Sequence, residues 1–121
     1  MDKKDSIYVA GHTGMVGSAI CRQLKKENYK NIITATHREL SLDNEQEVQR
    51  FFLNNKIDYV FLAAAKVGGI LANKEQGADF ITDNLKIQTN VIESAYKNKV
   101  KKLLFLGSSC IYPRESLQPI K

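Results

Sequence analysis

Two kinds of hydrophobic pattern alternate along the chain. Short apolar runs without regular polar interruption are typical of strands buried on both faces, and they predict strands at residues 6–10, 31–35, 59–63 and 102–106, with a weaker one near 40–42. Longer segments repeat apolar residues at helical spacing and predict helices at about 15–26, 44–54 and 79–97. Residues 113–121 predict irregular loop.

The two later helices carry more detailed expectations. Asp43 or Asn44 is expected to cap the second helix, because both side chains accept hydrogen bonds from free backbone N–H groups. Its inner face should be made by Val48, Phe51 and Phe52. In the third helix the apolar residues at helical spacing, which burial against the sheet explains, are Phe80, Ile81, Leu85, Val91, Ile92 and Ala95.

Strands that alternate with helices predict βαβ units and a parallel sheet. We therefore expect an α/β protein with a doubly wound, Rossmann-like sheet, incomplete at the C-terminus, whose strands lie in the order 3-2-1-4-5. No boundary of a second domain falls inside the chain, so residues 1–121 are predicted to form one domain. Ligands of such sheets bind beyond the carboxyl ends of the strands, so the loops after the first, second, fourth and fifth strands matter most.

Composition and charge narrow the class of protein. Of the 121 residues, 43% are hydrophobic and 26% charged, as expected of a soluble globular domain, and no apolar run is long enough to predict a membrane span. Lysines near predicted helix ends supply much of the net charge of +5. This placement favours a solvated charged face over a nucleic-acid-binding surface. A basic surface would still attract an anionic small molecule. Cys21 and Cys110 match no metal-ligand spacing and no signal peptide is evident, so we expect no metal and a cytoplasmic location.

A glycine motif follows the first predicted strand. The spacing G-x-x-G-x-x-G lies between that strand and a helix, which is the context of a dinucleotide-binding turn. Glycine gives the turn backbone freedom, and a pyrophosphate can approach bare N–H groups at the positive end of the helix. The residues expected to bind the cofactor here are Gly11, His12, Thr13, Gly14, Met15, Val16 and Gly17. The P-loop pattern G-x-x-x-x-G-K-[ST] does not occur, which argues against a P-loop enzyme.

The loop after the second strand should meet the adenosine ribose. His37 lies about 20 residues beyond the last glycine, at the distance where an acid would select NAD and a base the 2′-phosphate of NADP. His37 and Arg38 are basic and favour NADP, whereas the acidic Glu39 favours NAD. A solvated charged turn is the alternative. Leu42 and Asp43 are expected to border the adenine.

The loop after the fourth strand begins with Ala63, Ala64 and Ala65. Small side chains at the end of a strand let a flat ring system approach the backbone, although tight packing explains the alanines equally well. Lys66 follows them and is either a solvent lysine or a cofactor ligand. The alanines are therefore expected to line the cofactor site.

The loop after the fifth strand carries the candidate chemistry. Leu106 and Gly107 lead into Ser108, whose hydroxyl can polarise a carbonyl that receives hydride. Cys110 shares a face with Ser108 in extended backbone, and a thiol can exchange protons as an acid or base. A loop serine and a buried cysteine are the alternative. We expect Leu106, Gly107 and Ser108 to contact the cofactor, and Ser108 and Cys110 to be catalytic.

Three stretches, residues 11–20, 63–70 and 103–113, resemble the GDP-L-fucose synthases, a family of extended short-chain dehydrogenases/reductases. The resemblance implies epimerisation of GDP-4-keto-6-deoxy-D-mannose at C3 and C5, followed by reduction of the C4 ketone with NADPH. It places the catalytic serine at Ser108 and the epimerising cysteine at Cys110. Related sugar 4,6-dehydratases have an Asp-Glu pair in place of the two residues that precede Ile111, so this chain does not resemble them.

The chain also departs from that family. Thr13 stands where the family commonly has an arginine, and His37 stands near a second one that Arg38 can replace. The family's Tyr-x-x-x-Lys pair is absent, because none of the five tyrosines has lysine four residues later. The family places this pair, a catalytic histidine and the GDP-sugar domain further along than Lys121.

These departures predict that the chain is the N-terminal, NADP-binding portion of such an enzyme, without its substrate domain and inactive by itself. The resemblance implies a homodimer for the complete enzyme, paired through the helix at about residues 79–97. One alternative is another extended reductase or epimerase acting on a different nucleotide sugar. A second is a non-catalytic NADP-binding module.

Overall fold

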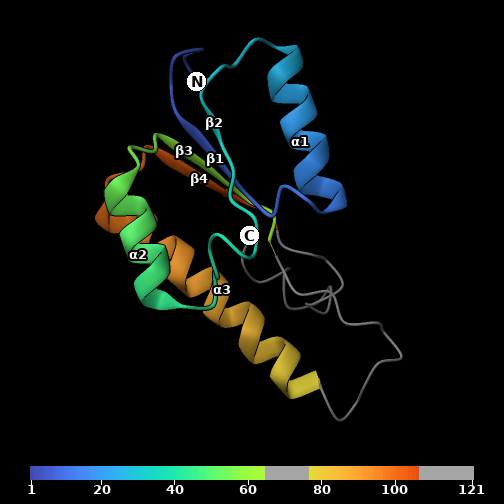
Figure 1. Ribbon diagram of the computed structural model, residues 1–121, viewed down its shortest axis with the longest axis vertical. Coiled ribbons are helices and arrows are strands. Elements are labelled where there is room, and N and C mark those ends of the chain that lie inside the picture. Colours follow the sequence, from blue (N-terminus) through green and yellow to red (C-terminus); the bar gives the residue numbers. More distant parts are fainter. Residues whose placement is uncertain (65–76, 107–121) are drawn as a thin grey trace, which may run out of the picture.

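The computed structural model describes residues 1–64 and 77–106, and gives the backbone alone for residues 77–83. Figure 1 shows strands and helices alternating along the chain. The elements are β1 (Ile7–Ala10), α1 (Met15–Lys26), β2 (Ile32–Ile33), α2 (Glu45–Asn54), β3 (Tyr59–Leu62), α3 (Gly77–Lys97) and β4 (Lys102–Phe105). The predicted α/β class is confirmed, and the first helix has the predicted bounds.

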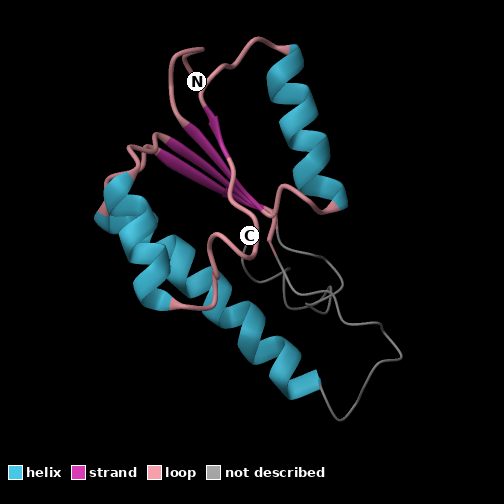
Figure 2. Cartoon of the chain, in the orientation of Figure 1, coloured by secondary structure: helices cyan, strands magenta, loops and turns pink. Residues whose placement is uncertain are grey.

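All strand pairs are parallel, and the strands lie in the order β2-β1-β3-β4. Ile7 of β1 pairs with Ile32 on one side and with Tyr59 on the other, so β1 is central. Figure 2 shows α1 on one face of the sheet and α2 with α3 on the opposite face. This is the doubly wound arrangement that the alternating pattern predicts, with β1, β2, β3 and β4 as the first, second, fourth and fifth expected strands.

The weak strand expected near residues 40–42 is wrong. Leu40 is buried, but its backbone N–H donates to the carbonyl of Thr36 at 2.9 Å in a turn. The N–H of Asn44 likewise donates to the carbonyl of Ser41 at 3.1 Å. Backbone groups engaged in turns are not available to a sheet ladder, so the apolar residues here mark a buried turn.

Both faces of the sheet are covered by apolar side chains. Toward α2 and α3, Tyr8 packs with ring centroids 4.9 Å from Phe51 and 5.9 Å from Phe52. The core on this side comprises Tyr8, Ala10, Leu40, Val48, Phe52, Ile57, Val60, Leu62, Ile87, Val91 and Ala95. Toward α1 it comprises Ile7, Val9 and Leu24. Every residue of β1 is buried, which explains its continuous apolar run, and the predicted inner face of α2 is confirmed.

The buried face of α3 is more polar than the sequence predicts. Val91 and Ala95 are buried as expected, whereas Leu85 and Ile92 are 49% and 44% exposed. The side chains of the other two apolar residues expected on this face, 80 and 81, lie outside the described residues. Asn84, Asn90 and Ser94 take part of the inner face instead. Counting apolar residues misplaced Leu85 and Ile92 because buried polar side chains with hydrogen-bond partners can take positions on the inner face.

Candidate functional site

The turn after β1 brings the chain against the end of β3. Gly11 has φ of +88°, in the region that favours glycine. A Cβ atom on Gly11 would lie 2.7 Å from the backbone nitrogen of Ala64, so the two backbones are in direct contact. The N–H of Gly14 donates to the Gly11 carbonyl at 3.1 Å and closes the turn. A side chain at residue 11 is therefore excluded both by backbone conformation and by space.

Helix α1 begins immediately after this turn. Gly17 is buried in its first turns, and a Cβ atom there would overlap the carbonyl oxygen of Gly11. A Cβ on Gly14 would meet only that same oxygen, at an ordinary 3.6 Å. Gly14 is the N-cap and makes no side-chain cap, and the first turn of α1 holds no acid. The N–H groups of this helix end are thus available to an anionic ligand.

A pocket of about 230 Å³ opens in front of the turn, at the carboxyl ends of β1, β2 and β3. We call it the edge pocket, and it is lined by Gly11, His12, Thr13, Gly14, Ala35, His37, Leu40, Leu42, Asp43, Ala63, Ala64 and Ile87. Its position is where doubly wound sheets bind their ligands. Glycine and alanine floor the pocket, which leaves backbone groups open to close approach. Among the described residues, no cluster of His, Cys, Asp and Glu could hold a metal ion.

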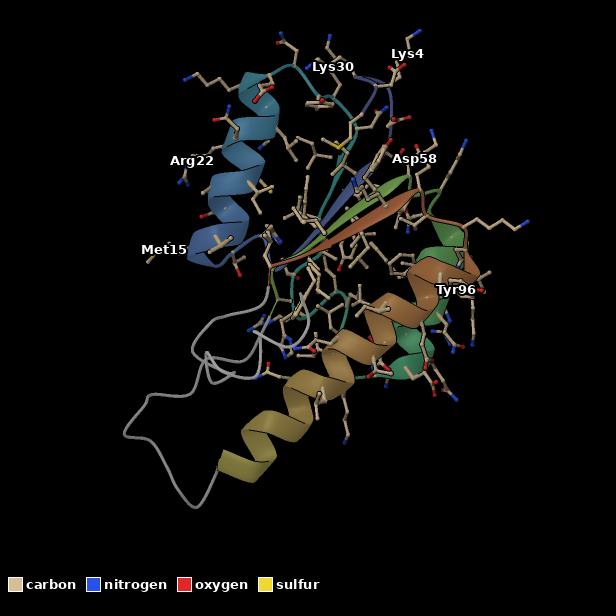
Figure 3. The ribbon with its side chains drawn as sticks, turned by 180° about the vertical axis from the view of Figure 1, so that it is seen from behind. Lys4, Met15, Arg22, Lys30, Asp58 and Tyr96 are labelled. Atoms are coloured by element: carbon tan, nitrogen blue, oxygen red, sulfur yellow. The ribbon has the colours of Figure 1, made fainter. Side chains whose placement is uncertain are left out.

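Of the expected cofactor residues that the structure describes, most lie in this pocket. Those that line it are Gly11, His12, Thr13, Gly14, His37, Leu42, Ala63 and Ala64, together with Asp43, which was expected beside Leu42 at the adenine. Those expected but not in the lining are Met15, Val16, Gly17, Arg38 and Leu106. Met15 is 88% exposed and projects away from the helix end in Figure 3. Gly17 acts instead by letting α1 lie against the Gly11 turn.

The remaining expected site residues, Ala65, Lys66, Gly107, Ser108 and Cys110, lie outside the described residues. Cys21, the other cysteine, packs on the α1 side of the sheet away from the edge pocket, and burial raises the pKa of its thiol.

Three lining residues were not expected. Ala35 was assigned to the second strand, which ends earlier, and Leu40 to a strand that does not form. Ile87 reaches the pocket from the middle of α3. No local sequence motif predicts that Ile87 lines the pocket, because its position there depends on how α3 crosses the sheet.

The turn after β2 is closed by reciprocal hydrogen bonds. The Glu39 carboxylate accepts from the Thr36 N–H at 2.8 Å, and the Glu39 N–H donates to the Thr36 hydroxyl at 3.2 Å. The bond from the Thr36 N–H, followed by the Thr36 side chain, holds the pKa of the Glu39 carboxyl below its usual range, and His12 acts weakly in the same direction. The carboxylate that could have bound a ribose therefore stabilises the turn.

One wall of the edge pocket is formed by residues 37–43. This wall is hydrogen-bonded to both α2 and α3. The Asn44 side chain caps α2 by accepting from the Glu47 N–H at 3.0 Å, which settles the choice of cap. The Glu47 carboxylate accepts from the Ser41 N–H at 3.3 Å. On the other side, the Asn90 amide donates to the Leu42 carbonyl at 2.9 Å. The wall is thus fixed although it has no regular secondary structure.

The sequence matches the NAD dependent epimerase/dehydratase family over residues 7–121. The chain belongs to this family. Two epimerase/dehydratase relatives are GDP-L-fucose synthase 1 of Arabidopsis thaliana, 59% identical over 98% of this chain and 37% of its own, and the GDP-L-fucose synthase of Escherichia coli (strain K12), 51% identical over 97% and 36%. The resemblance noted in the sequence is confirmed, and the chain spans little more than a third of the length of these curated relatives.

A solved structure similar to this chain agrees with the fold. MlghC, a GDP-mannoheptose C4 reductase from Campylobacter jejuni with NADP bound, superposes with a TM-score of 0.87 at 45% identity. The superposition covers all of this chain and 38% of that one. Within the part of the chain that the structure describes, no helix is long and apolar enough to span a bilayer.

Proposed function

We propose that the chain is the cofactor-binding part of an NADPH-dependent GDP-4-keto-6-deoxy-D-mannose epimerase-reductase, which makes GDP-L-fucose. The observation that carries the proposal is the edge pocket, in which the turn after β1 meets the ends of β2 and β3. The GDP-L-fucose synthases named above support the substrate, and the NADP-bound structure of MlghC supports the cofactor.

The edge pocket has the position at the sheet edge and the uncapped helix start that a dinucleotide site needs. A Cβ on Gly11 would overlap the backbone of Ala64, and a Cβ on Gly17 the Gly11 carbonyl, so glycine at both positions lets the start of α1 lie next to the turn. NADPH, when bound, supplies the hydride for the C4 ketone. The pyrophosphate would be held by N–H groups in the first turn of α1, which begins at Met15, and the adenosine half by the wall that contains His37 and Leu42.

NADP rather than NAD is favoured by the turn after β2. His37 lines the edge pocket and can donate to a 2′-phosphate, while the Glu39 carboxylate is engaged with the Thr36 N–H. Arg38 is exposed and lies outside the lining, where it adds positive charge near the same phosphate. The phosphate subsite would thus be built around the His37 imidazole, where the GDP-L-fucose synthases commonly have arginines.

The chemistry would be carried by residues that follow β4 in the sequence. Ser108 would donate a hydrogen bond to the C4 carbonyl oxygen, which makes the carbon more electrophilic. Cys110 would exchange protons at C3 and C5 of the sugar. Because the chain spans about 37% of its relatives, the activity needs groups from the rest of such an enzyme.

The proposal includes a cytoplasmic location and a homodimer formed through α3. Leu85, Ile92 and Tyr96 are 49%, 44% and 85% exposed, and their spacing places them along one side of the helix. An apolar stripe of this kind is typical of a helix that packs against another subunit. It is distinct from the buried side that carries Val91.

A titration of the chain with NADPH and NADH, followed by nucleotide fluorescence, tests the cofactor. We expect NADPH to bind at least about tenfold more tightly, and equal affinities contradict the assignment. For the complete enzyme, Cys110→Ser should impair epimerisation more than hydride transfer. If the isolated chain turns over the keto-sugar with NADPH, the view that it is only the cofactor-binding part is wrong.

A second candidate is a reductase of another GDP-sugar. The similarity to MlghC, named as a GDP-mannoheptose C4 reductase, favours it. Such an enzyme would reduce C4 without exchanging protons at neighbouring carbons. Solvent deuterium incorporation at C3 and C5 by the complete enzyme separates the two candidates, since only the epimerase-reductase incorporates it.

A further inference from the structure

We propose that Glu39 is a positioning residue for recognition of the adenosine 2′-phosphate, acting by locking the turn that holds His37 in the wall of the edge pocket. The inference rests on the proposed function and deepens it, because it names what sets the preference between the two nicotinamide cofactors. Glu39 itself is not in the lining of the pocket.

The turn is held by four hydrogen bonds between its two ends. The Thr36 carbonyl accepts from the N–H of Glu39 at 3.0 Å and from that of Leu40 at 2.9 Å. The Thr36 N–H and hydroxyl bond to the Glu39 carboxylate and N–H, at 2.8 Å and 3.2 Å. Thr36 and Glu39 are joined by backbone and side-chain hydrogen bonds, so His37 and Arg38 between them are confined to one conformation.

The closed turn determines whether His37 or Arg38 faces the ligand. His37 lines the edge pocket and Arg38 does not, although they are adjacent and both are exposed. Leu40, at the end of the turn, is buried in the core and also lines the pocket. The turn is therefore anchored at Leu40 and closed by Glu39, and it presents His37 to the pocket.

The carboxylate would have a different role if it bound ribose directly. An acid at this point of the fold accepts hydrogen bonds from the 2′- and 3′-hydroxyls and selects NAD. Here one oxygen of Glu39 accepts from the Thr36 N–H, which already satisfies a backbone donor. An amide oxygen could replace that acceptor but could not supply the charge, so substitution separates the two roles.

The test compares Glu39→Ala and Glu39→Gln in titrations of the chain with NADPH and NADH. Loss of the turn-closing bond in Glu39→Ala should weaken NADPH binding about fivefold and change NADH binding less than about twofold. Glu39→Gln retains the acceptor, so its affinity for NADPH should equal or exceed that of the wild type. Glu27→Ala removes another exposed carboxylate, at the far end of α1, and controls for net charge.

A second variant keeps the test independent of the carboxylate. Thr36→Val removes the hydroxyl that accepts from the Glu39 N–H, and it should lower the preference for NADPH in the same direction. Thermal unfolding of each variant shows whether the domain remains folded.

Three results would overturn the inference. One is that the wild-type chain binds NADPH and that Glu39→Ala has the same ratio of NADPH to NADH affinity as the wild type. Another is loss of NADH binding in Glu39→Gln, which would assign the carboxylate to the ribose. If the wild-type chain binds neither nucleotide, the proposed function fails and the inference fails with it.

Discussion

The side-chain amide of Asn90 in α3 donates a hydrogen bond to the backbone carbonyl of Leu42 at 2.9 Å. Asn90 is only 9% exposed, and Leu42 lies in the wall of the edge pocket. This bond joins the irregular wall to the long helix on the same face of the sheet. A buried amide placed in this way fixes a loop that regular secondary structure does not hold.

Asn90→Ala should therefore destabilise the domain by about 1–2 kcal/mol, because the Leu42 carbonyl loses a buried partner. It should also weaken NADPH binding, since the wall is released. Asn98→Ala is the matched control, because the Asn98 amide donates to the Ser94 carbonyl at 2.8 Å at the end of the same helix. Urea unfolding and nucleotide titration provide the measurements. Equal effects of the two variants on NADPH binding would show that the Asn90 bond does not support the wall.

Two glycines of the turn should respond differently to one added methyl group. Gly17→Ala places a Cβ on the Gly11 carbonyl oxygen, so we expect destabilisation of about 2 kcal/mol, measured by urea unfolding. Gly14→Ala has room in the structure and should cost less than about 1 kcal/mol, while its methyl group enters the edge pocket and weakens NADPH binding. A stable Gly17→Ala variant contradicts the packing derived for α1.

Acid should destabilise the domain partly through Asp5. The pKa of its carboxyl is lowered, first by the hydrogen bond from the Asp2 N–H and then by Lys101, whose ammonium lies 3.4 Å away. A folded-state pKa below the unfolded value contributes stability above about pH 4, which is lost as the pH falls through the folded value. Asp5→Asn should flatten the decline of the urea midpoint between about pH 5 and pH 2. An unchanged slope would remove Asp5 from the acid response.

The exposed stripe of α3 predicts self-association. Ile92→Lys places a charge in that stripe and should shift the chain toward monomer in sedimentation velocity. Leu53→Lys is the control, since Leu53 of α2 is 75% exposed and lies on a different helix. If both variants sediment like the wild type, α3 is not the interface in this chain.

The strands and the glycine turn could be predicted because their signals are local. β1 and β3 are short apolar runs, and Gly11 and Gly17 mark the turn by spacing alone. The inner face of α3 could not be predicted in the same way. Asn90 lies inside because a carbonyl from a distant loop meets it there, and such a partner is invisible to a count of apolar residues.

The edge pocket shows the same division. Its floor comes from the turn and from Ala63 and Ala64, which stand directly after strands that the sequence predicts. Ile87 enters the lining only because α3 crosses the end of the sheet. His37 was placed by its distance from the glycines, whereas the turn that separates it from Arg38 depends on hydrogen bonds between Thr36 and Glu39.

The central place of β1 has a consequence for synthesis on the ribosome. β1 is made first, yet Ile7 pairs with Ile32 and with Tyr59, so its second partner is the third strand to be made. At about 5–20 residues per second, roughly 3 to 10 s separate the emergence of β1 from that of β3. During this interval a fully apolar strand has at most one neighbour, and a ribosome-associated chaperone that shields β1 should raise the yield of folded protein.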